Sequence, residues 1–311
     1  MPTVSFIMPL YNAETTVGKM VDSIRNQTFT DWELIVVDDG STDTSGAILD
    51  DYAQTDVRIK VIHQKNSGVA SARQCGIDHA AGEYIIHADA DDWVDTDMLE
   101  SMVGMARREI ADIVIADYYV NYPSGDEAVV KQDFVSAHPG DVLFDIYNKK
   151  LFGGLWHKLI SKRAYMESKA RFLPDINYCE DVLLLTQILS NPNLKIVHLP
   201  DAFYHYCIAG SSLTRNVTKK GLENLKRFHN AAKSMLPFNA QQLKSIFDEF
   251  ALSEFKVLFM NKLYNNSSEL RDEFQRIKKI AYGSTNSLRW KLGYACLDCG
   301  LIGLAHKLLK Y

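Results

Sequence analysis

The sequence predicts an α/β fold in which a mostly parallel β-sheet is flanked by helices and followed by a C-terminal helical region. Strand-like and helix-like segments alternate four times within the first ~95 residues, which is typical of parallel sheets covered by helices on both faces. Acidic and other polar residues gather directly after the predicted strands. From about residue 217 onwards, apolar residues recur at helical spacing and strand-like runs are scarce.

Length and composition bound the possible classes of protein. The chain has 311 residues, a net charge of −5 and 47% hydrophobic residues, which describes an ordinary globular protein. This length allows a large domain and a smaller one, and we expect them at residues 1–215 and 216–311. The negative net charge and the lack of a long basic run argue against a nucleic-acid partner.

The expected location follows from the cysteines and the N-terminus. Five scattered cysteines, an odd number, argue against a secreted disulfide framework. The first residues lack a basic start and a long apolar stretch, so no signal peptide is expected. No window approaches the ~20 apolar residues of a membrane-spanning helix. We therefore expect a cytoplasmic protein, with peripheral contact to the inner face of the membrane as an option.

The first elements are predicted from buried runs and apolar spacing. A strand at residues 4–8 is closed by Pro9, which cannot continue a central strand. The next helix, at residues 13–27, carries apolar residues at helical spacing, among them Val17, Met20 and Ile24. The remaining predicted strands cover residues 33–38, 58–63 and 84–88, and the remaining predicted helices cover residues 46–53 and 66–82.

The order of elements changes after Trp93. Asp95 or Thr96 is a candidate cap for the next helix. Residues from 128 to about 148 receive no assignment. The further expected elements are a strand at 113–119, a hairpin-like region at 121–127, a helix from Glu180 onwards, two short strands at 195–199 and 202–206, and a loop at 209–215.

Three carboxylates lie within four positions directly after the fourth predicted strand. Like charges at such close spacing cost energy, and a divalent cation among them lowers that cost. We therefore predict that Asp89 and Asp91 bind a cation that holds a nucleotide diphosphate. In an extended Asp-Ala-Asp segment, alternate side chains would point the same way. Ligands of such sheets bind at the carboxyl ends of the strands, and further polar residues lie near those ends: Tyr11, Asp38, Asp39 and Arg73.

Glycine-rich phosphate-binding motifs do not occur where a nucleotide would need them. The first strand is not followed by GxGxxG, and the chain has no GxxxxGK[ST] motif. Backbone amides of a glycine-rich loop are therefore not expected to hold the phosphates. A hard cation on carboxylate oxygens is the other common solution, because it bridges phosphate oxygens and neutralises their charge.

Four segments in succession carry a family resemblance. They are residues 4–12 (VSFIMPLYN), 37–43 (VDDGSTD), 66–73 (NSGVASAR) and 89–92 (DADD). Together they resemble the motifs of family 2 inverting glycosyltransferases, whose GT-A fold is a Rossmann-like α/β fold. The resemblance extends over about residues 4–215. Four motifs in the right order and spacing are far more specific than a single DxD motif.

The resemblance implies a uridine nucleotide site at the first three motifs. Pro9 and Tyr11 would border the uracil, and Asp39 would accept the proton on uracil N3. Asp38 is assigned to the same site, with capping of the following turn as the alternative. Arg73 would assist at the base or at the diphosphate.

The fourth motif implies the metal site. Asp89 would hold a ribose hydroxyl, and Asp91 would ligate Mn²⁺ or Mg²⁺ against the diphosphate. Asp92 is less specific, because an Asp at this point could also start the next helix. His205 is a candidate third metal ligand, and the alternative is packing between its two neighbouring tyrosines.

A second acidic pair, Glu180-Asp181, opens a predicted helix. The family usually has such a pair here, which implies that Asp181 is the catalytic base and that Glu180 orients the acceptor or the base. An inverting transfer needs a carboxylate that takes the acceptor hydroxyl proton as its oxygen attacks the anomeric carbon. The metal would stabilise the charge on the departing diphosphate. The alternative is that both residues merely favour a helix N-terminus.

The sugar and acceptor contacts are predicted at residues 156–158, where the family commonly has Trp-Asn-Lys. Trp156 is expected beside the sugar, with a core tryptophan as the alternative. His157 replaces the usual Asn, and Lys158 follows it. Many relatives carry an Arg near Cys207, and in its absence Arg215 or Lys158 would contact the diphosphate. Two further residues of that loop, Ser211 and Ser212, would fold over the diphosphate.

The resemblance implies transfer of a hexose or N-acetylhexosamine from a UDP-sugar to a hydroxyl of a glycan acceptor, in capsule, O-antigen or exopolysaccharide synthesis. The acceptor could be lipid-linked. The C-terminal helices mix an apolar stripe with Trp290, Lys291 and Lys307, which suits a packed appendage, a membrane-facing surface or a homodimer contact.

Two other functions stay open at this point. One is a non-catalytic nucleotide-sugar-binding scaffold, which the intact Glu180-Asp181 pair disfavours. The other is a DxD phosphotransferase or phosphatase with Asp89 as nucleophile. That use places the DxD loop after the first strand, whereas here the segment follows the fourth.

Overall fold

A computed structural model describes residues 1–208 and 218–309 of the chain. The chain divides into two compact units, Met1–Gly210 and Ser211–Tyr311. The predicted phosphate-loop residues Ser211, Ser212 and Arg215 lie outside the described residues.

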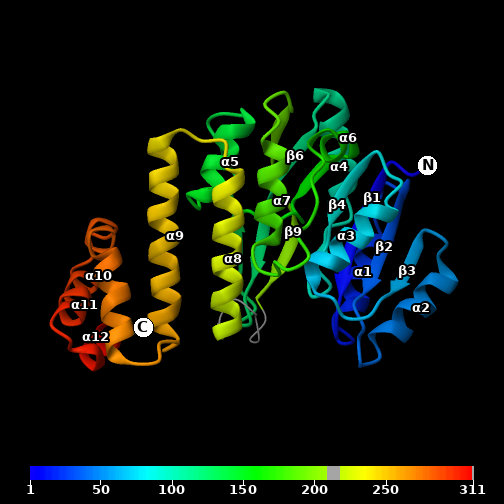
Figure 1. The fold of residues 1–311 in the computed structure, drawn as a ribbon. Coiled ribbons are helices and arrows are strands. Elements are labelled where there is room, and N and C mark those ends of the chain that lie inside the picture. Colours follow the sequence, from blue (N-terminus) through cyan, green and yellow to red (C-terminus); the bar gives the residue numbers. More distant parts are fainter. Residues whose placement is uncertain (209–217, 310–311) are drawn as a thin grey trace. The chain divides into compact units, whose positions relative to one another are not determined.

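Parallel strands form the N-terminal half of the sheet in the first unit (Figure 1). Their order is β3 (Ile59–His63), β2 (Trp32–Asp38), β1 (Val4–Leu10) and β4 (Tyr84–His87). The predicted alternation of strands and helices is confirmed, and the carboxyl ends of these strands meet at one edge of the sheet. The connecting helices are α1 (Val17–Arg25), α2 (Ser45–Thr55) and α3 (Val69–His79).

The second half of the sheet mixes strand directions. After β4 come the antiparallel β8 (Lys158–Ser161), then β6 (Ile113–Asn121), β9 (Ile196–Cys207) and β5 (Trp93–Val94). Strand β7 (Glu127–Val130) forms a hairpin with β6, as expected for the polar region between them.

The prediction of two short strands at 195–199 and 202–206 is wrong, because β9 runs through both. Leu199 pairs with Ala116 and Ala202 pairs with Asp117, so two residues of β9 lie between consecutive pairs. One of the two is Pro200, which has no N–H to donate to a ladder. The strand therefore continues through a bulge where the sequence pattern suggests a break.

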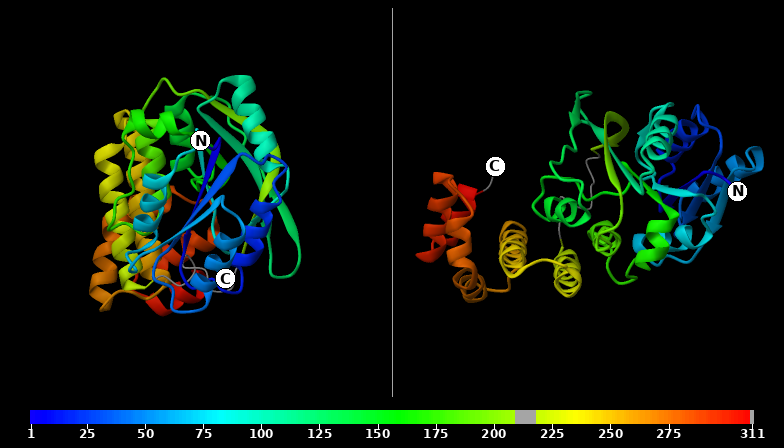
Figure 2. Two further views of the ribbon diagram at one scale, coloured as in Figure 1. Left: turned by 90° about the vertical axis from the view of Figure 1, so that its right-hand side faces the viewer. Right: turned by 90° about the horizontal axis from the view of Figure 1, so that it is seen from above.

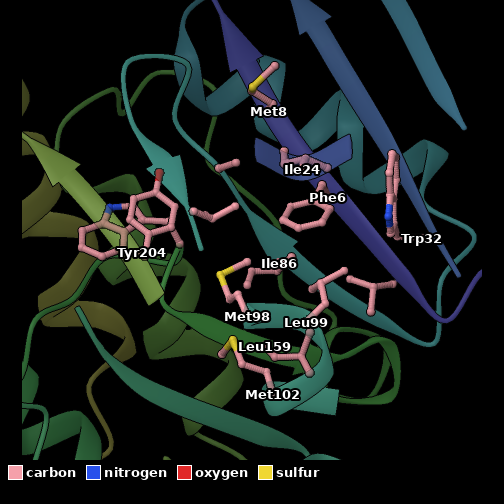
Figure 3. Packing of buried hydrophobic residues seen from close by; sticks show 14 of the residues in the cluster. Phe6, Met8, Ile24, Trp32, Ile86, Met98, Leu99, Met102, Leu159 and Tyr204 are labelled. Carbon is pink, nitrogen blue, oxygen red and sulfur yellow. The ribbon is translucent and has the colours of Figure 1, made fainter. Parts of the chain in front are cut away.

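Helices cover both faces of the sheet. Alternate residues of β1 face opposite sides. Phe6 and Met8 join an apolar cluster with α1 and α4 (Met98–Glu109), part of which Figure 3 shows. Ile7 faces α3, which packs so closely that a Cβ on Gly76 would lie 2.5 Å from Ile7 Cγ2. Packing on both faces fixes the strand ends, and with them the loops that carry the predicted site.

Helix α4 begins later than predicted. Its N-cap is Asp97, and that side chain makes no capping hydrogen bond. Asp95, one of the two expected caps, has its carboxylate 3.3 Å from His205 Nε2 instead. A tertiary partner therefore replaces the local capping interaction. The other helices of this unit are α5 (Pro139–Tyr147), in the stretch that received no assignment, α6 (Lys162–Ser168) and α7 (Glu180–Leu189).

The second unit is helical wherever the structure describes it, as the sequence predicts. Asn239 and Gln242 form a reciprocal capping box that starts the longest of its helices. Aromatic side chains of three helices, Phe259, Phe274 and Tyr294, lie in its core. Figure 2 shows the hairpin of the last two helices in red. The helices are α8 (Lys219–Met235), α9 (Ala240–Met260), α10 (Ser267–Gly283), α11 (Leu288–Asp298) and α12 (Ile302–Leu309). None of the described helices is both long and apolar enough to cross a bilayer.

Candidate active site

The carboxylates after β2 are supplied with hydrogen bonds from neighbouring loops. Asp38 Oδ1 accepts from the Ser41 amide at 2.9 Å, and Oδ2 accepts from His63 Nδ1 at 2.9 Å. Burial alone would raise the pKa of Asp38, but the hydrogen bonds from Ser41 and His63 outweigh it and lower the pKa. These contacts match the turn-capping alternative. Its assignment to the nucleotide stays a prediction.

Asp39 is buried and organises the third motif. Its Oδ1 accepts from Gln64 Nε2 at 2.7 Å and from the Ser67 amide at 2.8 Å. Its Oδ2 accepts from the Gly68 amide at 2.8 Å. Asp39 thus fixes the loop that enters α3. A uracil could donate only to a lone pair of the carboxylate that these three hydrogen bonds leave unused.

A segment far along the chain lies on the start of α3. Asn177 Oδ1 accepts from the Ala70 amide at 3.2 Å. Gly68 has a φ of 89°, and a Cβ there would lie 2.5 Å from Asn177 Oδ1, so only glycine allows this approach. The Phe172 amide donates to Gln74 Oε1 at 2.9 Å, one turn further along the same helix. Residues 171–177 therefore run along α3 and deliver Glu180 and Asp181 to it. The sequence pattern does not predict a role for Asn177, and the glycine that it faces, Gly68, is its local signal.

Arg73 joins the two acidic clusters. The side chain is buried on α3, and its Nη2 donates to Asp89 Oδ1 at 2.8 Å. Its Nε lies 3.6 Å from Glu180 Oε1. Burial alone would lower the pKa of Arg73, but the charges of Asp89, Glu180 and Asp181 raise it. Nε and Nη1 are buried without a hydrogen-bond partner among the described residues, which leaves two donors for a ligand.

The segment after β4 is a turn, so the predicted extended geometry of Asp-Ala-Asp is wrong. The Asp92 amide donates to the Asp89 carbonyl at 3.3 Å. Tyr204 holds both ends of this turn: its hydroxyl accepts from the Asp89 amide at 3.0 Å and donates to Asp92 Oδ2 at 2.9 Å. Asp92 Oδ1 also accepts from the Cys207 amide at 2.7 Å.

Asp92 is therefore a buried anchor and does not start α4, which begins at Met98. Burial and the charges of Asp89 and Asp91 raise the pKa of Asp92 to about 9. Tyr204 was also missed from the sequence. Its alternation with Tyr206 along the strand was the available signal.

Asp89 and Asp91 fit a divalent cation. The Asp91 side chain is exposed, yet partial desolvation by the surrounding protein and the charge of Asp89 raise the pKa of its carboxyl group. Hard carboxylate oxygens suit Mn²⁺ or Mg²⁺. Within residues 1–208 and 218–309, no group of three or more His, Cys, Asp and Glu side chains could hold a metal alone. Metals that bind nucleotides commonly use one or two carboxylates and complete their shell with phosphate oxygens and water.

The second acidic pair starts α7. Asp181 Oδ1 accepts from the Val182 amide at 2.8 Å. Burial and the charge of Asp181 raise the pKa of Glu180 to about 7, although Arg73 opposes the shift. Burial also raises the pKa of Asp181, again against Arg73. Carboxylates with raised pKa values beside a guanidinium are suited to accept and hold a proton near neutral pH.

Trp156, His157 and Lys158 are buried and contact the protein itself. The Trp156 ring stacks on Tyr204 with centroids 4.3 Å apart. Lys158 Nζ donates to the carbonyls of Phe152 at 2.8 Å and Gly154 at 2.7 Å, and lies 2.6 Å from His157 Nε2. These are the contacts of core residues, and their roles toward sugar or acceptor stay predictions.

His205 has partners other than a metal. Its ring stacks between Trp93 and Tyr119, with centroids 3.4 and 4.4 Å away. Nε2 lies 3.3 Å from an Asp95 oxygen, and Nδ1 lies 3.2 Å from a Glu127 oxygen. This is the packing alternative, with both ring nitrogens engaged. The metal role of His205 stays a prediction.

The first motif borders the same edge of the sheet. The predicted end of the first strand at Pro9 is wrong, because β1 continues to Leu10 and Pro9 is buried within it opposite Val37. Tyr11 follows that strand with 51% of its surface exposed. The Asn12 amide donates to Ser41 Oγ at 3.0 Å, so this loop is held to the loop after β2. A nucleobase beside Tyr11 would therefore lie near the second motif. That Pro9 and Tyr11 border a uracil stays a prediction.

Known proteins share both the sequence pattern and the fold. The sequence model of Glycosyl transferase family 2 matches residues 5–171. The putative glycosyltransferase EpsH of Bacillus subtilis (strain 168) is 30% identical over 290 residues, covering 90% of this chain and 82% of that protein.

Two solved structures resemble the whole chain. The structure of S. aureus TarS 1-349 in complex with UDP-GlcNAc matches with a TM-score of 0.69 at 19% sequence identity. The match covers 99% of this chain and 90% of the TarS chain. The mannosyltransferase PcManGT from Pyrobaculum calidifontis, in complex with GDP-Man and Mn²⁺, has a TM-score of 0.54 at 17% identity, with 99% and 87% covered. The predicted GT-A fold is confirmed by these likenesses and by the sheet. On the evidence of its sequence, the chain belongs to glycosyl transferase family 2.

Proposed function

We propose that this chain is an inverting, metal-dependent transferase that moves a hexose or N-acetylhexosamine from a UDP-sugar to a hydroxyl of a glycan acceptor, in capsule, O-antigen or exopolysaccharide synthesis. One observation carries the proposal. Arg73 contacts both Asp89 and Glu180, so the carboxylates for the donor and the pair for the acceptor share one edge of the sheet.

The donor would bind across the ends of β1, β2 and β4. The UDP-GlcNAc complex of TarS, on a similar fold, supports a UDP-sugar. Asp89 and Asp91 would hold Mn²⁺ or Mg²⁺, and Mn²⁺ in the PcManGT complex supports this assignment. When bound, the metal would offset the negative charge of the diphosphate. Nη1 of Arg73, which makes no hydrogen bond among the described residues, would donate to the bound donor.

The transfer step is assigned to α7. Asp181 would take the proton of the acceptor hydroxyl while that oxygen forms its bond to the anomeric carbon. The bond from that carbon to the diphosphate oxygen would break on the opposite face, so that UDP leaves and the configuration inverts. Glu180, beside Arg73, would orient the acceptor.

The acceptor is proposed to be lipid-linked, with the enzyme at the cytoplasmic face of a membrane. Among the described residues of the second unit, the exposed large apolar side chains all lie on α11, on α12 or in the turn between them: Leu288, Leu292, Leu301 and Leu304, between 48% and 71% exposed. Exposed Lys291 and Lys307 lie on the same hairpin, whereas its acidic Asp298 is paired with Lys278. Leucines flanked by cations suit an anionic lipid surface.

The donor is tested first by heat stability. UDP-, GDP- and dTDP-sugars are screened for stabilisation with Mn²⁺ or with EDTA, and UDP-sugars with Mn²⁺ are expected to raise Tm. UDP release in the presence of a glycan acceptor then separates a transferase from a scaffold that binds without turnover. Stabilisation by GDP- or dTDP-sugars alone would refute the UDP assignment, and phosphate release from an aryl phosphate would favour the phosphatase alternative.

The membrane contact is tested by flotation with vesicles. We expect binding to vesicles that contain anionic phosphatidylglycerol and little binding to neutral phosphatidylcholine. The double variant Leu292→Ser, Leu304→Ser should lose binding, while Val57→Ser, Val135→Ser, with even more exposed apolar side chains in the first unit, should keep it. A dimer that these leucine variants dissociate, without any flotation, would assign the surface to a second copy of the chain.

A further inference from the structure

Lys158 is a buried lysine with a complete set of acceptors. Its side chain is 1% exposed at the start of β8. The three acceptors around Nζ are the carbonyls of Phe152 and Gly154 and the Nε2 of His157, all within 2.8 Å. Burying an amine is costly unless its hydrogen bonds are replaced, and here each N–H has a replacement.

The two carbonyls belong to a loop that lies against the start of α7. Gly153 stands between them, and a Cβ at this position would lie 2.6 Å from Val182 Cγ2 and 3.2 Å from Ile146 Cγ2. Val182 directly follows Asp181 and gives its amide to the Asp181 carboxylate at 2.8 Å. The loop therefore touches the one turn of α7 that carries the acidic pair.

The other end of the loop is also held. The Phe152 amide donates to Gln132 Oε1 at 2.9 Å, and the Gln132 amide donates to Asp117 Oδ1 at 2.7 Å. This chain of contacts reaches β6, so the loop is fixed to the sheet on one side and by Lys158 on the other. The loop therefore fixes the first turn of α7 relative to the sheet.

We propose that Lys158 is a positioning residue for Asp181: its amine holds the carbonyls of Phe152 and Gly154 so that Gly153 seats the first turn of α7. The inference deepens the proposed function, because it assumes that Asp181 acts on the acceptor. In this role Lys158 does not contact the sugar directly. It holds the loop that positions the proposed catalytic base, Asp181.

Electrostatics supports the same link. Burial lowers the pKa of Lys158, and the nearby charge of Asp181 opposes that shift. In return, Lys158 opposes the rise in the pKa of Asp181 that burial causes. His157 assists only through its Nε2, since its Nδ1 is buried without a hydrogen-bond partner among the described residues.

The test uses the full chain with three variants. Lys158→Met removes the amine and keeps the length of the side chain, and Gly153→Ala pushes on Val182 without changing a charge. Lys162→Met is the matched control, since Lys162 Nζ also donates to a backbone carbonyl, that of Ala80 at 2.7 Å, at the C-terminal end of α3. Hydrogen–deuterium exchange of residues 180–186 needs no substrate and so is independent of the proposed function.

Exchange at residues 180–186 should become about tenfold or more faster in Lys158→Met and Gly153→Ala, and should stay unchanged in Lys162→Met. With the UDP-sugar donor, kcat should fall about 100-fold in both, because a displaced base misses its proton, while KM for donor stays within about twofold. If Lys158→Met does not fold, Gly153→Ala gives the same readout.

Unchanged exchange in both variants would overturn the inference, whatever the enzyme transfers. A rise in donor or acceptor KM with kcat preserved in Lys158→Met would also overturn it, in favour of direct sugar contact. If no donor is turned over by the unaltered chain, the exchange result still decides the inference, and only the proposed function fails.

Discussion

Two groups of carboxylates lie at the same edge of the sheet and differ in the hydrogen bonds and charges that surround them. After β2, Asp38 and Asp39 accept five hydrogen bonds between them from loop amides and side chains. After β4, desolvation and the charge of Asp89 raise the pKa of Asp91, although its side chain is exposed. At α7, burial and like charges raise the pKa values of Glu180 and Asp181. The first group stabilises the loops that it contacts. The second group lowers the free energy of unfolding as long as no ligand is bound.

The difference separates residues that shape a site from residues that act in it. A carboxylate that accepts two or three hydrogen bonds from its own loops stabilises those loops and has fewer lone pairs left for a ligand. A carboxylate held near other negative charges gains most when a cation or a proton arrives. Arg73 offsets part of the repulsion in the second group, which explains why the clusters can approach each other.

The largest effect is expected for Asp181→Asn. Loss of a general base lowers kcat about 10²- to 10⁴-fold, while UDP affinity in Mn²⁺ should stay unchanged because the donor contacts lie elsewhere. Single-turnover kinetics and calorimetry with UDP measure the two quantities. A variant that keeps its kcat would place Asp181 among the structural carboxylates.

Next in size is Asp39→Ala. The side chain of Gln64 and the amides of Ser67 and Gly68 would lose their acceptor, at a cost of about 3 kcal/mol in the free energy of unfolding. Urea unfolding followed by tryptophan fluorescence reports on the first unit, which holds three of the four tryptophans: Trp32, Trp93 and Trp156. Asp91→Ala is the control and should not destabilise the chain. Equal losses in both would erase the distinction between the groups.

Asp91→Asn should reduce Mn²⁺-dependent UDP affinity about 10- to 100-fold, because one of two carboxylate ligands is removed. Calorimetry in Mn²⁺ and in EDTA separates the metal-dependent part of the binding. In EDTA the variant and the unaltered chain should bind UDP alike. The same Mn²⁺-dependent affinity in both proteins would exclude Asp91 as a ligand.

The smallest effect concerns pH. Glu180 has a pKa raised from 4.5 to about 7 in the fold, so the folded chain binds more protons than the unfolded chain between these values. Its contribution therefore favours folding at low pH and is lost as pH rises through about 7. Glu180→Gln, which stays neutral, should be more stable than the unaltered chain at pH 8.

At pH 4, below both pKa values, the side chain is largely neutral in the folded and the unfolded chain, so the stabilities of the two proteins should converge. Urea unfolding of the metal-free proteins at the two pH values measures the difference. A variant that is less stable than the unaltered chain at pH 8 would mean that the charge of Glu180 is held favourably by Arg73. Glu180 would then belong with the hydrogen-bonded group.

Local pattern accounts for most of what was predicted correctly. The strands β1 to β4 and the helices between them follow from buried runs and helical spacing, because both depend on residues close in the chain. The helical C-terminal region follows for the same reason. The acidic residues after β4 became candidates because ligands of parallel sheets gather at the carboxyl ends of strands. The pair at α7 became a candidate through the family resemblance, and the roles of both groups stay predictions.

The tertiary structure alone decided which of these residues meet. Arg73 contacts an acid 16 positions away, Ala70 contacts Asn177 from 107 positions away, and Tyr204 bends the chain at Asp92 from 112 positions away. Lys158 could be assigned to the core only when its acceptors were seen. Burial and distant partners set pKa values and hydrogen-bond supply, and neither is encoded in local periodicity. The sequence therefore determined the strands, the helices and the candidate acids, and the packing decided which acids are fixed and which are left for a ligand.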